Sequence, residues 1–256
     1  MQIVTLTTDF GLNDYYVAVL KGSMLQQNPN LHLIDIAHAI KSFDIVQGAF
    51  VLKNAWRSFP QGSIHVVSIN SYSKGQMVFL AIRHQGHYFV GPDNGIFSLL
   101  FDQLPEEIYA LALPENSSFP LTEVFANAVK HIAGKKDFKE IGQPVEEILQ
   151  RITLQPVINP LQIRGAVVHI DAYENVVVNI SKELFEQQRN KRKFALFFKR
   201  NDPIKNLSTH YHDVAVGEPL CLFNSAHYLE IAINMGKASS MLGLKLGDTI
   251  QIDFHV

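Results

Sequence analysis

The first half of the sequence alternates short apolar runs with segments of helical periodicity, and this alternation restricts the possible folds. Apolar runs cover Gln2–Thr8, Leu31–Ile36 and Ser63–Ile69, and polar turn residues follow them. Helical spacing recurs from Tyr16 to Met24 and in the segments Ile45–Trp56, Ile96–Leu104 and Glu123–Ala133. Strands alternating with helices are typical of a layered α/β domain, and the scarcity of charge in Ser63–Ile69 indicates a buried parallel strand. We therefore predict an N-terminal layered α/β domain with a mostly parallel sheet.

The pattern changes after about Lys135, where three prolines interrupt a stretch without periodicity. We place the N-terminal domain at residues 1–150, a linker at 151–162 and a smaller C-terminal domain at 163–256. Short strands with frequent turn signals favour a β-barrel or a sandwich for the second domain. The predicted strands are Ala166–Ile170, Val176–Ile180, Phe194–Phe198, Leu220–Phe223, Leu229–Ile233 and Thr249–Phe254.

Charge and cysteine content limit the classes of partner. Lys and Arg number 22 against 24 Asp and Glu, which gives a net charge of -2 and no field that would draw the chain onto nucleic acid or a membrane. The expected partner is a small molecule or another copy of the chain. The sequence holds one cysteine, Cys221, in the apolar run Leu220–Phe223, where it is expected to pack in a core. Without a leader, a long apolar span or a cysteine pair, a reducing cytoplasmic location is expected.

Carboxylates at the end of the first strand are candidates for ligand binding. Asp9 and Asp14 follow Gln2–Thr8, and open α/β sheets bind ligands at the carboxyl ends of their strands. A carboxylate there suits the two hydroxyls of a ribose. The alternative is that Asp9 caps the following helix.

Other polar clusters have a structural interpretation beside a functional one. The segment from Gly91 to Gly95 is typical of a turn before a helix, and Asp35 with His38 ends the second predicted strand. His38 is interpreted as a structural group, with acid–base or metal chemistry as the alternative. His210–Asp213 is expected to be a polar strand or loop, and the basic run Gln187–Lys193 a solvated helix end or loop.

Several common catalytic signatures are missing. The sequence has no GxGxxG after a strand, no GxxxxGK[ST], no GxSxG and no paired-cysteine zinc pattern. These absences argue against hydride transfer, P-loop phosphoryl transfer and serine hydrolysis, and we expect neither a cofactor nor a metal ion.

The order of the motifs nevertheless resembles one family. Thr8-Asp9-Phe10-Gly11, Asp35-Ile36-Ala37-His38, Gly91-Pro92-Asp93-Asn94-Gly95, Asp171-Ala172-Tyr173-Glu174-Asn175 and Leu229-Glu230-Ile231-Ala232 follow one another along nearly the whole chain. This succession is similar to the S-adenosyl-L-methionine hydroxide adenosyltransferases, relatives of the fluorinase and chlorinase. The resemblance implies an N-terminal α/β domain, a C-terminal β-barrel, a homotrimer, and S-adenosyl-L-methionine bound between neighbouring subunits.

The resemblance also implies roles for individual residues. Asp9 would hold the ribose hydroxyls, Asp14 the amino group of the methionine part, and Phe43 would wall the ribose. The second domain would line the methionine and adenine parts with Asp171, Tyr173, Asn175, Ser225, Asn234 and Ala238.

The chain departs from the resemblance where a nucleophile would be activated. The hydroxide-using relatives carry an aspartate, an arginine and a histidine that are taken to orient and activate water. At these positions the chain has Asn70, Met77 and Pro120. None of these three side chains accepts a proton at neutral pH. Ser73 lies where halogenating relatives place a hydroxyl for the halide, and Glu123 and His38 are substitute candidates for activating water.

Two hypotheses of different class remain. The first is an enzyme that cleaves S-adenosyl-L-methionine by substitution at C5′, giving adenosine and L-methionine. The second is a catalytically impaired trimeric protein that binds a nucleoside. The fold and the binding residues implied by the resemblance support the first, which we take as the leading hypothesis, and the loss of the three activating groups supports the second.

Overall fold

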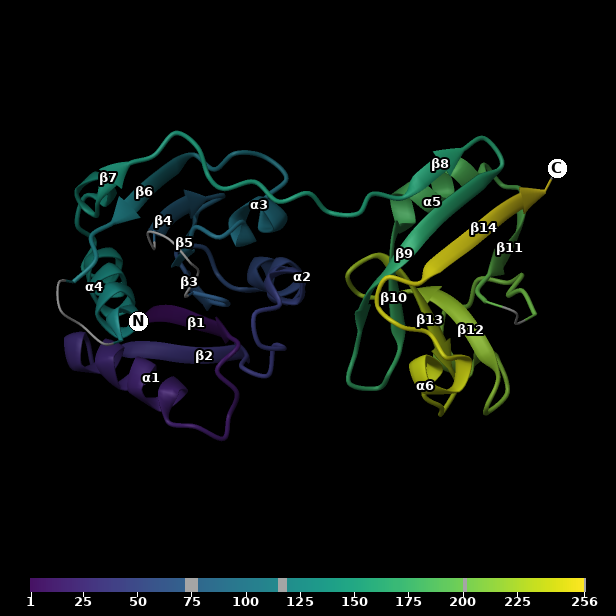
Figure 1. The fold of residues 1–256 in the computed structure, drawn as a ribbon, viewed down its shortest axis with the longest axis horizontal. Helices are drawn as coiled ribbons and strands as arrows, with labels where there is room; N and C mark the ends of the chain where they lie inside the picture. The colour runs from purple at the N-terminus through teal and green to yellow at the C-terminus, as the bar shows by residue number, and fades with distance from the viewer. Residues whose placement is uncertain (72–77, 115–118, 200–201, 256) are drawn as a thin grey trace. The chain divides into compact units, whose positions relative to one another are not determined.

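The chain forms two compact units, Met1–Ile152 and Thr153–Val256, each with its own sheet. The computed structural model describes residues 1–71, 78–114, 119–199 and 202–255 (Figure 1). Part of the segment expected to be a linker, 151–162, forms a strand, β8 (Val157–Asn159), which pairs with β9 (Gln162–Ile170) of the second unit.

The first unit contains a seven-stranded sheet in the order β2-β1-β3-β5-β4-β6-β7. The strands β2, β1, β3 and β5 pair in parallel, and the remaining pairs are antiparallel. This arrangement confirms the α/β class, and the strand predicted at Gln2–Thr8 is found with the same ends. The bounds are β1 Gln2–Thr8, β2 Leu31–Ala37, β3 Ile64–Ser68, β4 Phe79–His84, β5 His87–Pro92, β6 Glu107–Leu111 and β7 Gln143–Pro144.

The hairpin of β4 and β5 was not predicted. Its two-residue turn, Gln85-Gly86, has φ of 48° and 76°, and positive φ at both positions is what a type I′ turn requires. Glycine adopts this conformation readily, but glutamine is not among the residues that commonly indicate such a turn in a sequence. The turn therefore carries a weak local sequence signal.

Helices cover both faces of this sheet and make a three-layer unit (Figure 1). α1 (Tyr16–Gln27) and α4 (Pro120–Ala133) bury Leu20, Met24 and Phe125 on one face. α2 (Ile45–Ala55) and α3 (Ile96–Leu100) pack on the other, against Val67 and Phe89 among others. Neighbouring residues of one strand face opposite cores because side chains alternate along a strand.

Two helix ends differ from the prediction. α3 stops at Leu100, four residues earlier than expected, because Phe101 is already extended with φ of -106° and ψ of 133°. α4 begins at Pro120, three residues before the predicted start at Glu123. Proline is well suited to the first turn of a helix, where its missing N–H has no acceptor to lose. A 3-10 turn, Trp56–Ser58, continues α2, and another covers Phe138–Glu140.

The second unit is a curled antiparallel sheet in the order β11-β14-β9-β10-β13-β12. Phe185, on α5, lies at the centre of its core and meets Phe194, Phe223 and Phe254 edge to face. The predicted strands are all present, although α5 and α6 were not expected as helices. The bounds are β10 Val176–Ser181, β11 Lys193–Phe197, β12 Pro219–Phe223, β13 Tyr228–Ile233, β14 Thr249–His255, α5 Lys182–Arg189 and α6 Ala238–Leu242.

Three minor sequence interpretations are resolved in this unit. Cys221 is fully buried in the core, as expected, and burial raises the pKa of its thiol to about 12. The basic run Gln187–Lys193 includes the end of α5 at Arg189. His210–Asp213, expected as a strand or loop, instead forms a 3-10 turn over Tyr211–Asp213 in which Asp213 accepts the N–H groups of Thr209 and His210. Among the described residues, no helix combines the length and the apolar character needed to cross a bilayer.

A chain of buried polar groups crosses the first sheet on the α2 face. His65 Nδ1 lies 2.8 Å from Thr5 Oγ1, and its Nε2 lies 3.1 Å from His87 Nδ1. The His65 side chain is fully buried, with Trp56 and Phe89 beside it. Burial, and then the nearby His87, lower the pKa of His65 to about 3, so this imidazole is neutral in the folded protein at neutral pH.

We predict that His65 makes the fold sensitive to mild acid. Its pKa lies below the unfolded value of 6.5, so the unfolded chain binds more protons between about pH 3 and 6.5. The free energy of unfolding therefore decreases as the pH falls through this window, by about 2 kcal/mol from His65 alone between pH 7 and pH 5. Urea denaturation at the two pH values measures the change.

The matched variants are His65→Gln and His32→Gln, since His32 is exposed. His65→Gln is less stable at pH 7 but loses less stability between pH 7 and pH 5, whereas His32→Gln retains the wild-type dependence. A His65→Gln variant with the full wild-type pH dependence would contradict the prediction.

Candidate active site

The carboxylate of Asp9 is held by two backbone amides from distant loops. Asp9 follows β1, and its Oδ2 accepts the N–H of Phe43 at 2.9 Å and that of Asn70 at 3.1 Å. The alternative that Asp9 caps α1 is wrong, because that helix begins at Tyr16 without a side-chain cap. Oδ1 of Asp9 accepts no hydrogen bond from the part of the chain that the structure describes. One carboxylate oxygen therefore organises the loops and the other stays available to a ligand.

Both donor residues have a left-handed backbone. Phe43 has φ of 70° and Asn70 has φ of 47°, and this region is costly for a bulky aromatic residue. Strained backbone of this kind costs about 1–3 kcal/mol per residue and persists where surrounding contacts impose it. Here the contact is the hydrogen bond of each N–H to Asp9 Oδ2, so the strained backbone of both residues depends on the Asp9 carboxylate.

Asn94 ties the loop after β3 to the loop after β5. Its Nδ2 donates to the backbone oxygens of Ile69 at 2.8 Å and Asn70 at 3.2 Å, and its Oδ1 accepts the N–H of Ile96 at 3.2 Å. Gly95 completes the turn with φ of 92°. The predicted turn is therefore shorter than expected, because Gly91 and Pro92 still belong to β5 and only Asp93–Gly95 turn; Asn94 in this turn also fixes Asn70.

Arg151, near the C-terminal end of the first unit, contacts the same turn after β5 that contains Asn94. Its Nε donates to the backbone oxygen of Asn94 at 2.8 Å, and its backbone N–H donates to Ser98 Oγ at 2.9 Å. Nearby, Asp93 Oδ1 accepts the N–H of Leu149 at 2.9 Å, and burial raises the pKa of Asp93. Arg151 was missed from the sequence because it stands in an unperiodic stretch 57 residues from Asn94.

These loops line a cavity of about 350 Å³ that is open to solvent. Phe43, Asn70 and Arg151 all line it, and the first turn of α2 forms part of its wall. Two sequence-predicted site residues, Phe43 and Asn70, are thus brought together with Arg151. The full lining is Lys41, Ser42, Phe43, Asp44, Ile45, Val46, Asn70 and Arg151.

His38 has a structural role. Its ring is buried, with Nδ1 2.8 Å from Thr8 Oγ1 and Nε2 2.9 Å from Asp35 Oδ1. Asp35 is also paired with Lys21 at 2.6 Å. The hydrogen bond to Thr8 and the proximity of Asp35 favour the structural interpretation.

The remaining candidate residues of the first unit lie outside the hydrogen-bond network around Asp9. Asp14 is exposed in the loop before α1 and makes no ion pair or side-chain hydrogen bond with described residues. Pro120 opens α4, and the preceding Phe119 packs against Phe10 and Tyr16. Ser73 and Met77 lie outside the described residues.

In the second unit, Asp171 shapes the loop that carries the predicted Tyr173 and Asn175. Its Oδ1 accepts the N–H groups of Tyr173 at 2.9 Å and Asn175 at 2.8 Å, and its Oδ2 accepts Asn175 Nδ2 at 3.1 Å. Asn175 is buried, whereas the Tyr173 side chain is 78% exposed. The loop therefore presents an aromatic ring on a fixed backbone.

A buried glutamate supports the turn of Ser225. Glu230 accepts the Tyr211 hydroxyl at 2.8 Å and Asn224 Nδ2 at 3.2 Å, and burial raises the pKa of the Glu230 carboxyl. Asn224 Oδ1 in turn accepts the N–H groups of Ala226 and Tyr228 across Ser225. Glu230 was missed as a functional candidate because it lies within a strand of apolar residues.

The other two candidates of this unit are held in place by backbone contacts and packing. Asn234 Nδ2 donates to the backbone oxygen of Val214 at 2.8 Å, and Ala238 is buried at the start of α6.

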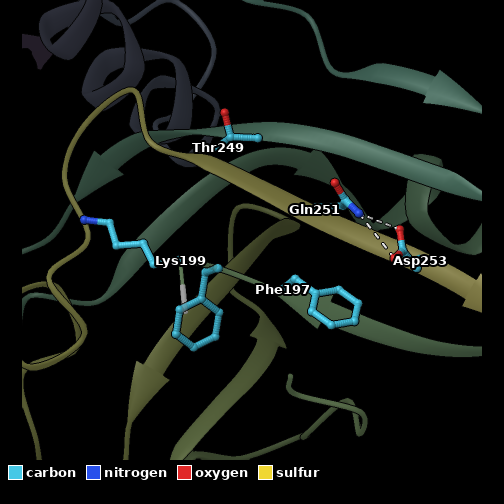
Figure 2. Close-up of a pocket in the computed structure, with 6 residues that line it drawn as sticks. Phe197, Lys199, Thr249, Gln251 and Asp253 are labelled. Carbon is cyan, nitrogen blue, oxygen red and sulfur yellow. Dashed lines mark hydrogen bonds between the residues drawn. The ribbon is translucent and has the colours of Figure 1, made fainter. Parts of the chain in front are cut away.

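A second cavity of about 360 Å³ lies along β14 and the end of β11 (Figure 2). Three of its polar side chains are paired: Gln251 Nε2 donates to Asp253, and Lys199 Nζ lies 3.0 Å from Asp248 Oδ2. None of the sequence-predicted site residues lines it. We assign it no role.

Comparison with known proteins gives matches to one family in both units of the chain. The profile of the SAM hydroxide adenosyltransferase N-terminal domain matches residues 4–142, and that of the C-terminal domain matches residues 165–251. The chain is 29% identical to a protein of Methanocaldococcus jannaschii named (R)-S-adenosyl-L-methionine hydrolase, with 98% of this chain and 96% of the relative covered. It is 23% identical to a fluorinase of Nocardia brasiliensis, with 98% and 96% covered.

A solved structure gives the same result. The crystal structure of an uncharacterized conserved protein from Thermotoga maritima superposes with a TM-score of 0.89 at 27% identity, covering 98% of this chain and all of that one. The agreement extends along nearly the whole sequence, and the N-terminal profile alone matches more than half of it. The chain therefore belongs to the S-adenosyl-L-methionine hydroxide adenosyltransferase family.

Proposed function

We propose that this chain is an S-adenosyl-L-methionine hydrolase that forms adenosine and L-methionine. The family membership and the relatives named as hydrolases support this activity. The observation that carries it in the structure is Asp9, whose Oδ2 is anchored by Phe43 and Asn70. The second oxygen, Oδ1, offers two lone pairs to the two hydroxyls of a ribose. A neutral side chain in that place would accept fewer hydrogen bonds.

The reaction has a good leaving group. An O–C5′ bond forms, the C5′–S bond breaks, and its electron pair returns to sulfur, so the sulfonium leaves as the neutral thioether of methionine. Water as nucleophile releases a proton, whereas hydroxide does not. The barrier thus depends mainly on supplying and desolvating the nucleophile.

The family resemblance extends the proposal to the substrate contacts. Asp14 would hold the amino group of the methionine part and Phe43 would wall the ribose. The second unit would line the methionine and adenine parts through Asp171, Tyr173, Asn175, Ser225, Asn234 and Ala238. The proposal includes the closure of the second sheet into a barrel and a homotrimer in which each site is shared between neighbouring subunits.

Turnover is expected to be slow in this family member. Asn70, Met77 and Pro120 stand where the resemblance places acidic, basic and imidazole groups, and general-base assistance is typically worth about 10²–10⁴-fold. The alternative is a nucleoside-binding protein without turnover, which those three residues favour. The relatives named as hydrolases favour turnover.

We predict that Asp9→Asn weakens substrate binding without disturbing the loops. The amide oxygen of asparagine can still accept the N–H groups of Phe43 and Asn70, but the group facing the ribose becomes a donor. Loss of a charge-assisted hydrogen bond costs about 1.5–3 kcal/mol, so the Kd for S-adenosyl-L-methionine rises about 10- to 100-fold. Isothermal calorimetry measures it.

Asp9→Ala serves as the comparison. It removes the acceptor of both loop amides and lowers the free energy of unfolding by about 1–3 kcal/mol in addition to weakening binding. Asp102→Asn, which changes an exposed carboxylate paired with Lys53, is the control and leaves the Kd unchanged. An unchanged Kd in Asp9→Asn would exclude Asp9 from ribose binding.

We predict that restoring the activating groups accelerates hydrolysis. The triple change Asn70→Asp, Met77→Arg and Pro120→His raises the rate of adenosine release about 10²-fold or more, because a proton acceptor becomes available. Aspartate tolerates the left-handed backbone of Asn70, so this substitution preserves the loop. Chromatographic measurement of adenosine and methionine follows the reaction.

Folding of the triple variant must be compared with wild type by circular dichroism, since Pro120 begins α4. A wild-type protein that binds S-adenosyl-L-methionine but releases no adenosine would establish the binding-protein alternative. Efficient wild-type hydrolysis would show that another group activates water.

A shared site predicts complementation between two inactive variants. Asp9→Ala and Tyr173→Ala change different units of the chain, so co-refolded trimers combine an intact first unit of one subunit with an intact second unit of its neighbour. We expect the mixture to release adenosine and each variant alone to release none. Sedimentation of the wild type as a monomer would contradict it.

A further inference from the structure

Glu174, in the second unit, has a backbone conformation that its surroundings must impose. Its φ is 64°, in the left-handed region that glycine enters readily and residues with a side chain enter at a cost. Glu174 stands between Tyr173 and Asn175, in the loop that Asp171 shapes through its side chain. The N–H of Glu174 donates to the backbone oxygen of Asp171 at 3.0 Å. A strained residue in this loop indicates a contact that holds it there.

That contact is made with the start of α6. The backbone oxygen of Glu174 accepts the N–H of Ser239 at 2.9 Å. Its Oε2 accepts the N–H of Ser240 at 3.1 Å and also the Ser240 hydroxyl. Lys237 Nζ lies 3.0 Å from Oε1. One residue of the loop therefore binds the whole first turn of α6.

Glu174 supplies an N-terminal cap that α6 does not provide for itself. Lys237, at the N-cap position, makes no side-chain capping hydrogen bond, and the first turn holds no acidic residue. The leading N–H groups of a helix have no acceptor within the helix, and Glu174 accepts those of Ser239 and Ser240. Hydrogen bonds from Ser240 and then from Lys237 lower the pKa of Glu174, which keeps its carboxylate in the accepting form.

The two segments that Glu174 joins carry most of the substrate contacts proposed for the second unit. Tyr173 and Asn175 flank Glu174 in the chain, and α6 begins at Ala238. Asp171 shapes the loop from within, whereas Glu174 determines where the loop lies against α6. Because the Tyr173 side chain is largely exposed, the place of its ring depends on the backbone that carries it.

We propose that Glu174 is a positioning residue for nucleoside binding, which holds loop 171–175 on α6 and so fixes Tyr173 relative to Ala238 before the substrate binds. The inference rests on the proposed function. A loop that is already ordered avoids the entropy cost of ordering it on binding. Glu174 therefore acts on the affinity for the nucleoside and not on the chemical step at C5′.

Glu174→Gly is the central variant, because glycine removes the side-chain contacts and relieves the left-handed backbone in one change. We expect the calorimetric Kd for S-adenosyl-L-methionine and for adenosine to rise about 3- to 10-fold, since one side chain and its loop must then be ordered on binding. The KM for S-adenosyl-L-methionine rises similarly and kcat stays within about 2-fold of wild type, as for a contact equally strong in ground and transition states.

Two further variants separate positioning from a general effect on the fold. Lys191→Gly is the matched control, because Lys191 is exposed in another loop of the second unit and also has a left-handed backbone, with φ of 62°. It leaves Kd and KM unchanged. Glu174→Gln keeps an oxygen that accepts from Ser240 and loses the largely exposed ion pair with Lys237, so its Kd returns to within about 2-fold of wild type.

The contact between the loop and α6 is also measurable without a ligand. Hydrogen exchange followed by mass spectrometry is expected to be faster in residues 171–175 and 237–242 of Glu174→Gly than of wild type, because the Ser240 N–H loses its acceptor. Lys191→Gly retains wild-type exchange in both segments. Ser240→Ala removes the hydroxyl donor from the other side of the contact and raises Kd in the same direction, which keeps the test decisive if Glu174→Gly misfolds.

The outcomes separate this inference from the proposed function. A Kd unchanged in Glu174→Gly, or a kcat that falls while KM stays constant, would overturn the inference alone. A wild type that binds both ligands without releasing adenosine, together with a raised Kd in Glu174→Gly, would overturn the hydrolase and support the inference. A wild type that binds neither ligand would overturn both.

Discussion

The hydrogen bonds from Phe43 and Asn70 to one oxygen of Asp9 determine the geometry of the site. They join three loops that follow β1, β2 and β3, and they stabilise a left-handed backbone at two non-glycine residues. Through Asn70 the arrangement continues to Asn94 and Arg151. Because the loops are held by a charge, the same carboxylate that would bind a ligand also sustains the folded shape around it.

The sheet explains why these loops meet. In a parallel sheet all carboxyl ends lie at one edge, so residues after β1, β3 and β5 become neighbours although they are separated by many residues. A site built there combines rigid strands with loops that specify chemistry.

The fold was largely predictable from the sequence, and the site only in part. Asp9 and Asn70 directly follow predicted strands, and Phe43 is implied by the family resemblance, so these three could be proposed in advance. Arg151 could not, because its position depends on hydrogen bonds to Asn94 and Ser98 that no local pattern records. The Gln85-Gly86 turn and the hydrogen bonds of the buried Glu230 were equally unpredictable from local sequence, because tertiary packing determines both.

The two-residue strand β7 has a consequence for the protein's behaviour in solution. It ends the first sheet with Gln143 and Pro144, and proline has no N–H to offer to an additional strand. A further chain therefore cannot extend the sheet readily at that edge. The opposite edge, β2, is seven residues long and carries the ion pair of Asp35 with Lys21. Those charges resist docking of an apolar strand, so the sheet is protected against edge-to-edge aggregation on both sides by different means.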